Sequence, residues 1–235
     1  MATSYMDYTS PNAQFTYDLN NTVFYKKNNR NTINELSIHQ LNTLGNTSLL
    51  DIYLSTGGVV EPHIHQNASE LVYCIAGAAV VSLINPFTKE LLNFPITPGQ
   101  VANVPQGWWH YEIASVDDTH LLAIFDAPVP EAIFGSDIFR LTPASVLAHT
   151  YCLNEAAVKQ AFAPITETVV IGPPSNCKNK QTRFEPHDRQ QSAQPVREMQ
   201  RDPIHQAPYY QNQSFGSQSQ RPLPYPGYPY QQSHR

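Results

Sequence analysis

The stretch of sequence that decides the fold runs from residue 57 to residue 77 and reads GGVVEPHIHQNASELVYCIAG. Side chains alternate between the two faces of a β-strand, so His63 and His65 are predicted to point to the same face. Glu70 follows a short polar turn and begins the next apolar run, so its carboxylate can reach the same space. Burying two imidazoles and a carboxylate is costly unless they bind something. The stretch therefore predicts a metal site inside a β-structure.

Short apolar segments surround this stretch between residues 49 and 125. They are rich in Val, Ile, Leu and Tyr, and Gly, Pro or Asn separates them. Regularly spaced short strands with turn signals between them are typical of a β-sandwich or barrel. Residues 85–90 have the turn chemistry of a hairpin tip. No helical crossover pattern intervenes, so the sequence predicts an all-β fold and excludes a parallel α/β sheet.

A second stretch, GQVANVPQGWWH at residues 99–110, supplies another imidazole. Pro105 and Gly107 predict a tight turn, and His110 begins the strand that follows it. His110 is therefore a further candidate ligand beside His63, His65 and Glu70.

The two stretches closely resemble the two sequence motifs of the cupin superfamily. The first motif is matched at all of its positions, which are Gly57, His63, His65, Glu70 and Gly77. The second is matched by Gly99, Pro105, Gly107 and His110, whereas Ala114 stands where the family has Asn. The resemblance extends over residues 35–165 and is to single-domain germins and bacterial oxalate decarboxylases. It implies a jelly-roll barrel in which His63, His65, Glu70 and His110 hold one divalent metal ion.

Three nitrogen donors and one oxygen donor suit Mn(II), Fe(II), Ni(II) or Zn(II). Zinc is normally satisfied by four ligands in a tetrahedron. The octahedral arrangement usual in the family keeps two positions for water or substrate, so the resemblance favours manganese or iron, with manganese first.

The composition divides the chain into three parts. Residues 1–34 are predicted to be an N-terminal extension with possible edge strands at residues 14–17 and 22–25. Residues 35–165 form the barrel and its C-terminal helices. Residues 166–235 are predicted to be a disordered tail, because the segment after residue 174 is crowded with Gln, Pro, Ser, Arg and Tyr and has almost no aliphatic residues.

Two short helices are expected after the last strand. Thr142 and Pro143 have the residue types of an N-cap and a first helical position. Asn154 is expected to cap the second helix. The first helix is expected to turn three side chains towards the barrel, those of Val146, Leu147 and Tyr151.

Charge and composition exclude several classes of protein. The net charge is −5 and only 14% of residues are charged, which argues against nucleic-acid binding. The sequence offers neither a secretory signal nor an apolar run long enough for a membrane span, so a cytoplasmic location is expected. The three cysteines are too scattered for a disulfide framework, and Cys74 is predicted to be a buried free thiol.

Three kinds of function remain open. The first is a Mn- or Fe-dependent enzyme similar to oxalate decarboxylase or oxidase, acting on a small carboxylic acid, with Glu131 of the lid-like loop as the proton carrier. The second is a non-catalytic component of a bacterial spore coat or similar assembly, with the tail as the interaction arm. The third is a small-ligand sensor. The resemblance also implies a homo-oligomer.

Overall fold

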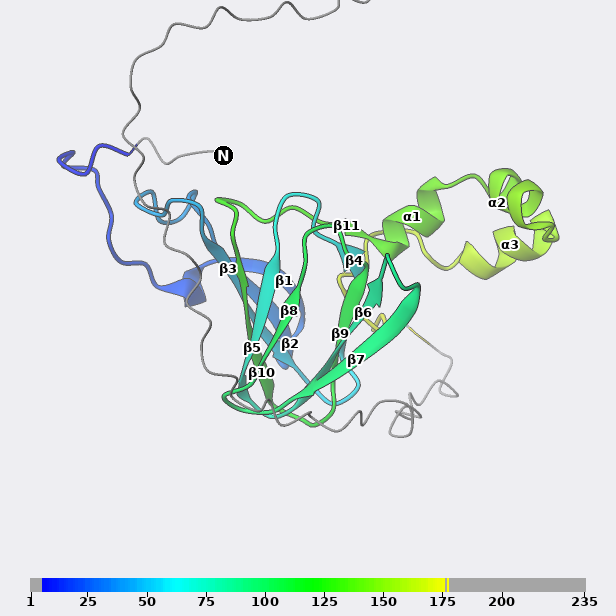
Figure 1. Cartoon of the computed structure of the whole chain (residues 1–235), viewed down its shortest axis with the longest axis horizontal. Coiled ribbons are helices and arrows are strands. Elements are labelled where there is room, and N and C mark those ends of the chain that lie inside the picture. Colours follow the sequence, from blue (N-terminus) through cyan, green and yellow to red (C-terminus); the bar gives the residue numbers. More distant parts are fainter. Residues whose placement is uncertain (1–5, 176, 178–235) are drawn as a thin grey trace, which may run out of the picture. The chain divides into compact units, whose positions relative to one another are not determined.

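Two antiparallel sheets face each other and enclose the core (Figure 1). The first sheet has the strand order β1-β2-β3-β10-β5-β8, and the second has the order β11-β4-β9-β6-β7, with β12 also paired to β4. The computed structural model describes residues 6–175 and 177, and these residues belong to one unit, Met1–Ser192. The arrangement confirms the predicted all-β jelly-roll class.

The strands are short, as the sequence indicates. They are β1 (Val23–Asn28), β2 (Asn31–Leu36), β3 (Ser48–Leu54), β4 (Val59–Ile64), β5 (Glu70–Ala76), β6 (Ala79–Asn85), β7 (Glu90–Ile96), β8 (Val101–Val104), β9 (His110–Ala114), β10 (Thr119–Phe125), β11 (Ile133–Phe134) and β12 (Ile171–Gly172). The 3-10 turn η1 (Leu19–Asn21) precedes β1.

Alternation along the strands decides which side chains enter the core. On β5, Glu70, Val72 and Cys74 are buried, while the residues between them are exposed. The adjacent strand β10 alternates buried and half-buried residues over its whole length. Because the period of two is strict on β5, the same register that buries Val72 also carries Glu70 into the interior. Cys74 is buried and free, as predicted.

The turn between β5 and β6 depends on Gly77. Its φ is +73°, in the left-handed region that residues with a Cβ rarely adopt. A Cβ added there would lie 2.7 Å from both Cα and Oγ1 of Thr119. The fully buried Thr119 also bonds to Ala78 O through its hydroxyl, so it has little freedom to move.

Gly77→Ala is therefore expected to lower the free energy of unfolding by about 2–4 kcal/mol, from the left-handed backbone and the overpacking together. Urea denaturation of the metal-free protein measures the change. Gly45→Ala is the matched control, because nothing lies within 4 Å of a Cβ at that position. Equal midpoints for the two variants would contradict the role assigned to Gly77.

The N-terminal part differs from the expectation in two respects. The strand expected at residues 22–25 is present as β1, at the edge of its sheet, but residues 14–17 form no strand. The boundary predicted at residue 35 falls inside β2, and β2 pairs with β3 through Thr32, Ile33 and the residues after them. The sheet thus extends back to Val23. Polar residues are frequent in β2, and two of them, Asn31 and Asn34, are buried, so the apolar pattern did not reveal this strand.

Three helices follow β11, of which the sequence predicted two. The first, α1 (Gly135–Leu141), was not expected, and Thr142 is its C-cap. The second, α2 (Ala144–Tyr151), begins after Pro143, one residue later than predicted. The third, α3 (Glu155–Phe162), is capped as expected by the Asn154 side chain, which accepts a hydrogen bond from the backbone N–H of Ala157.

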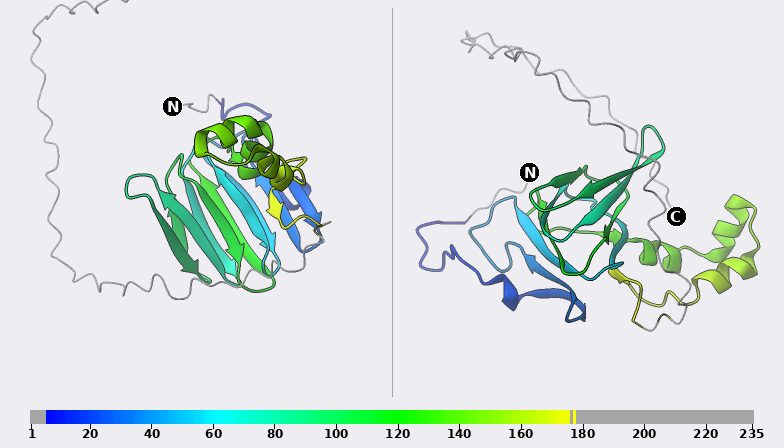
Figure 2. Two further views of the ribbon diagram at one scale, coloured as in Figure 1. Left: turned by 90° about the vertical axis from the view of Figure 1, so that its right-hand side faces the viewer. Right: turned by 90° about the horizontal axis from the view of Figure 1, so that it is seen from below.

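The expectation that α2 turns its apolar side chains towards the barrel is wrong. Val146 and Tyr151 are 52% and 66% exposed. Instead, α2 packs against α3, and both helices project from the sheets (Figures 1 and 2). Because α2 and α3 pack against each other as a hairpin, each helix buries part of its apolar face without facing the barrel.

No helix in the described part of the chain is long and apolar enough to cross a bilayer. Residues 178–235 lie outside the described residues, and so does most of the predicted tail. The tail's disorder, its role as an interaction arm and a place in a spore coat remain predictions. The cytoplasmic location does too.

Candidate metal centre

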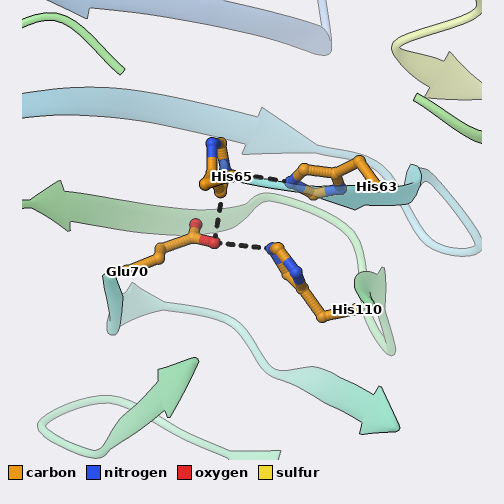
Figure 3. A group of neighbouring side chains, drawn as sticks. All are labelled: His63, His65, Glu70 and His110. Atoms are coloured by element: carbon orange, nitrogen blue, oxygen red, sulfur yellow. Dashed lines mark hydrogen bonds and ion pairs between the residues drawn. The ribbon is translucent and has the colours of Figure 1, made fainter. Parts of the chain in front are cut away.

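Four buried side chains lie close together and point towards one another (Figure 3). We call His63, His65, Glu70 and His110 the histidine–glutamate cluster. Each offers one donor atom, and these atoms all lie within 4.8 Å of one another. All four residues are those that the sequence predicts as ligands, and the fold brings them together from three strands.

Each residue of the cluster lies at or next to the end of a strand, and these strand ends fix its position. His63 lies near the end of β4 and His65 just after it, while Glu70 is the first residue of β5. His110 is the first residue of β9 and pairs directly with His63 across the sheet. The turn before β9 is tied down by Gly107, whose N–H donates to His65 O at 3.0 Å. Gly107 adopts φ +80°, which is why this tight turn uses glycine.

Each imidazole of the cluster is oriented by a backbone carbonyl. In each ring Nδ1 lies within hydrogen-bond distance of a carbonyl oxygen, so Nδ1–H is the donor and Nε2 is left facing the centre. The three bonds run from His63 to Glu61 at 2.7 Å, from His65 to Glu131 at 2.9 Å and from His110 to Trp108 at 2.8 Å. Hydrogen bonds of this kind are the usual support of metal-binding histidines.

The spacing of the Nε2 atoms tests whether a cation fits. Nε2 of His63 lies 3.1 Å from Nε2 of His65. Because both rings use Nδ1 as the donor, two lone pairs face each other in the neutral rings and repel unless something positive lies between them. Two adjacent ligands at about 2.1 Å from one ion are separated by about 3 Å, so the observed spacing fits a shared divalent ion. The donor set and its support suit a metal.

Without a metal, the charge balance rests on the pair of Glu70 and His110. Burial opposes ionisation of Glu70, but hydrogen bonds and charges from His110 and His65 hold the pKa of its carboxyl well below the ordinary value. Burial also opposes protonation of His110, yet its 2.8 Å bond to Glu70 Oε2 raises the pKa of the imidazole to about 9. Burial, then the charges of His110 and His65, lower the pKa of His63. A protonated His110 thus supplies positive charge where a metal would.

Glu112 is a second buried carboxylate that the sequence analysis missed. It is 1% exposed, its Oε1 lies 3.8 Å from Nε2 of His110, and neither oxygen has a hydrogen-bond partner among the described residues. Burial, followed by the charge of Glu70, raises the pKa of Glu112 to about 8. The sequence contained the information needed to find Glu112. It lies two residues after His110 on the same strand, so its side chain shares the inward face with that of His110.

Glu112 is expected to make the metal-free protein less stable as the pH rises. A carboxyl that titrates near 4.5 when unfolded and near 8 when folded holds its proton longer in the folded state. The free energy of unfolding therefore falls between about pH 4.5 and pH 8. Glu112→Gln removes this loss, so the stability of the variant relative to the wild type should rise by about 4 kcal/mol between pH 5 and pH 8. Urea denaturation at both pH values measures it, and a constant difference between the two proteins would contradict the assignment.

A cavity of about 370 Å³ opens beside the cluster. Three members of the cluster, His63, His65 and Glu70, line it. The loop before β11 forms another part of its wall through Pro130, Glu131 and Ala132. A group bound at the metal would therefore extend into this cavity.

Glu131, the proton carrier proposed from the sequence, lies in this wall. Its backbone carbonyl accepts the Nδ1–H bond of His65, and its N–H donates to Asn67 Oδ1 at 3.0 Å. Its carboxylate accepts a hydrogen bond of 3.2 Å from Gln66 Nε2. The backbone of Glu131 thus supports the cluster, while its side chain lines the cavity.

The sequence comparisons with known proteins agree on one family. A family model described as Cupin matches residues 17–159, more than half of the chain. Nectarin-1 of Nicotiana plumbaginifolia is 32% identical over 145 residues, which cover 57% of this chain and 61% of that protein. Germin-like protein 1-2 of Oryza sativa subsp. japonica is 30% identical over 131 residues, which cover 52% of this chain and 58% of that protein. The chain thus spans about three fifths of the length of these relatives.

Solved structures give the same fold at lower sequence identity. Oxalate decarboxylase from Bacillus subtilis superposes with a TM-score of 0.56 at 19% identity, over 63% of this chain and 41% of that one. The coconut allergen cocosin superposes with a TM-score of 0.60 at 23% identity, over 66% of this chain and 42% of that one. At such identities the superpositions establish the barrel alone.

Proposed function

Since the chain belongs to the cupin family, we propose that it binds one divalent metal ion in the histidine–glutamate cluster and uses that ion to bind and transform a small organic molecule in the adjacent cavity. The convergence of four buried donor atoms within 4.8 Å carries this proposal. Isolated buried imidazoles are usually core residues, but packing does not explain three imidazoles whose Nε2 atoms gather with one carboxylate within 4.8 Å.

Manganese is the first candidate for the ion, and iron is the second. Three imidazole nitrogens and one carboxylate oxygen suit either metal and leave positions for further ligands. When bound, the ion supplies Lewis acidity and orients a substrate oxygen. A structure of Bacillus subtilis oxalate decarboxylase that shares this barrel is described with Mn(II) centres, and this supports manganese as the first candidate.

The chain's own residues hold the ion, shield it and move a proton. Three backbone carbonyls fix the imidazole rings, and the two sheets exclude bulk water from the cluster. Glu131 has a carboxylate in the cavity wall, so we assign it the proton transfer to or from the bound molecule. Its backbone carbonyl supports the His65 ring independently of its side chain. A substitution of the side chain therefore tests the proton transfer without removing that support.

The enzymatic part of the proposal is tested with the metal-loaded full chain. Oxygen uptake and release of carbon dioxide, formate or peroxide are followed over a panel of small acids, alcohols and ketones, with oxalate included and metal-free protein as the blank. We expect metal-dependent turnover that falls at least about tenfold in Glu131→Gln, while its metal content is unchanged because the backbone carbonyl remains. Full metal occupancy without turnover on any compound would contradict the enzymatic role.

A homo-oligomer is a further part of the proposal. On the outer face of β5, Leu71, Tyr73 and Ile75 form a row of apolar side chains that are 37–40% exposed. A continuous apolar row on a sheet face favours contact with another protein surface. We expect light scattering to give the mass of at least a dimer for the full chain. A monomer at micromolar concentration would contradict this.

A further inference from the structure

We propose that the cavity beside the histidine–glutamate cluster takes an uncharged, mainly apolar molecule with an oxygen donor at one end, instead of a small dianion. The inference rests on the proposed metal function for the donor end of the ligand, and on the cavity lining for the rest. It names a substrate class that the likeness to other cupins does not supply.

The walls away from the cluster are mainly apolar, with Glu35, Gln66 and Glu131 as their polar members. Nine of the fifteen lining residues are apolar, and they come from both sheets and from the loop before β11. Ile33, Leu50 and Ile52 of the first sheet form one side, and Phe134 with Val170 forms another. Ile33 and Ile52 are 1% and 2% exposed, so the cavity reaches into the core. A polar ligand filling this space would lose its water contacts and gain few hydrogen-bond partners in return.

The charged groups of the lining are all acidic. Glu35, Glu70 and Glu131 line the cavity, and no lysine or arginine of residues 6–175 does. Of these, Glu70 is buried, Glu35 is half-buried and Glu131 is exposed. A dianion bound at the ion would meet these carboxylates and no basic side chain of the lining, and its repulsion from the buried Glu70, which is the least screened by water, would cost binding free energy. An uncharged ligand avoids this cost and can still offer a lone pair to the ion.

The size and the open end of the cavity suit a ligand with an extended body. A volume of about 370 Å³ lies in the range of small-molecule sites and far exceeds what a six-atom dianion occupies. Phe24 of β1 lines the cavity and is 48% exposed, so this wall borders solvent. A molecule bound to the ion by one end can therefore place its apolar body against Phe24.

The test compares two ligands that share a metal-binding end, acetohydroxamic and hexanohydroxamic acid, with the dianion oxalate. Both hydroxamic acids chelate the ion as monoanions, so the pair tests the apolar body of the ligand, oxalate tests the penalty for a second negative charge, and the neutral probe N-phenyl-1-naphthylamine tests binding of an uncharged molecule. Binding of acetohydroxamic acid, hexanohydroxamic acid and oxalate to the Mn(II)-loaded full chain is measured by calorimetry. Each fully buried CH₂ raises affinity about fourfold, so the four extra carbons should raise it at least about tenfold even if only half are buried. Oxalate should bind more weakly than acetohydroxamic acid. Phe24→Ala should reduce the gain from chain length, and Phe87→Ala, an 85% exposed phenylalanine outside the cavity, should not.

A second readout is independent of the metal. In the metal-free protein, the uncharged fluorescent probe N-phenyl-1-naphthylamine should bind, and Phe24→Ala should weaken this binding at least about threefold relative to Phe87→Ala. Bound manganese with equal affinity for the two hydroxamic acids, or with oxalate bound tightest, would overturn the inference and leave the metal function intact. Failure to bind manganese, with the probe still sensitive to Phe24→Ala, would overturn the metal function and support the apolar cavity.

Discussion

A variant in which His63 and His65 are both replaced with alanine is expected to bind Mn(II) at least about 100-fold more weakly than the wild type, because loss of supporting groups alone costs 10–100-fold at metal sites. The two imidazoles supply half of the donor atoms of the cluster. Their removal also eliminates the repulsion between the two Nε2 lone pairs that face each other at 3.1 Å. The free energy of unfolding of the metal-free variant should therefore be at least as high as that of the metal-free wild type. Calorimetric titration of Mn(II) into both proteins measures the loss of affinity.

His39→Ala is the matched control for this variant. His39 is exposed and is not a member of the cluster, so its replacement should leave Mn(II) affinity unchanged. Metal binding should also stabilise the wild type by about 2.7 kcal/mol at a free Mn(II) concentration 100 times the dissociation constant, and this stabilisation should vanish in the double variant. Equal affinities of the double variant and His39→Ala would mean that the ion binds elsewhere.

Glu61→Ala is expected to lower the free energy of unfolding by about 3–5 kcal/mol, since it leaves several buried donors without an acceptor. Glu61 is 7% exposed on β4. One of its carboxylate oxygens accepts from Ser136 N at 2.9 Å, and the other accepts from Ser136 Oγ at 2.7 Å, Val170 N at 2.9 Å and Val169 N at 3.1 Å. The carboxylate thus joins the start of α1 and the segment before β12 to the sheet that carries His63.

Glu167→Ala is the control for Glu61→Ala, because this exposed glutamate lies near the same segment, and its loss should change stability by less than about 0.5 kcal/mol. Ser136→Ala should fall between the two, at about 1 kcal/mol, because Glu61 keeps its backbone partners. Urea denaturation of the metal-free proteins ranks the three variants. A loss below 1 kcal/mol for Glu61→Ala would show that water replaces the missing carboxylate.

The cluster was predictable from the sequence because its geometry is local. His63 and His65 share a face by the strand period, Glu70 begins the next strand, and the Pro105–Gly107 turn sets the start of β9. The cupin membership that the motifs implied is borne out over residues 17–159. Each strand start and turn needed only neighbouring residues, whereas joining His110 to the other three residues rested on the resemblance to the cupin motifs.

Features that depend on distant residues were not predictable in this way. Glu61 looks like an ordinary strand glutamate, and its partners lie 75 to 109 residues further along the chain. The cavity is formed by β2, β3, the loop before β11 and Val170 together, so no single segment of the sequence predicts it. The orientation of α2 was mispredicted because an apolar stripe indicates that a helix packs against another element but does not identify that element.

Elemental analysis of the purified full chain, beside the His63→Ala, His65→Ala double variant grown in the same manganese- and iron-supplemented medium, tests the central claim most directly. We predict close to one manganese or iron ion per wild-type chain and almost none in the double variant. Metal-free wild-type protein, or equal metal content in both proteins, would contradict the assignment of a metal centre to the histidine–glutamate cluster.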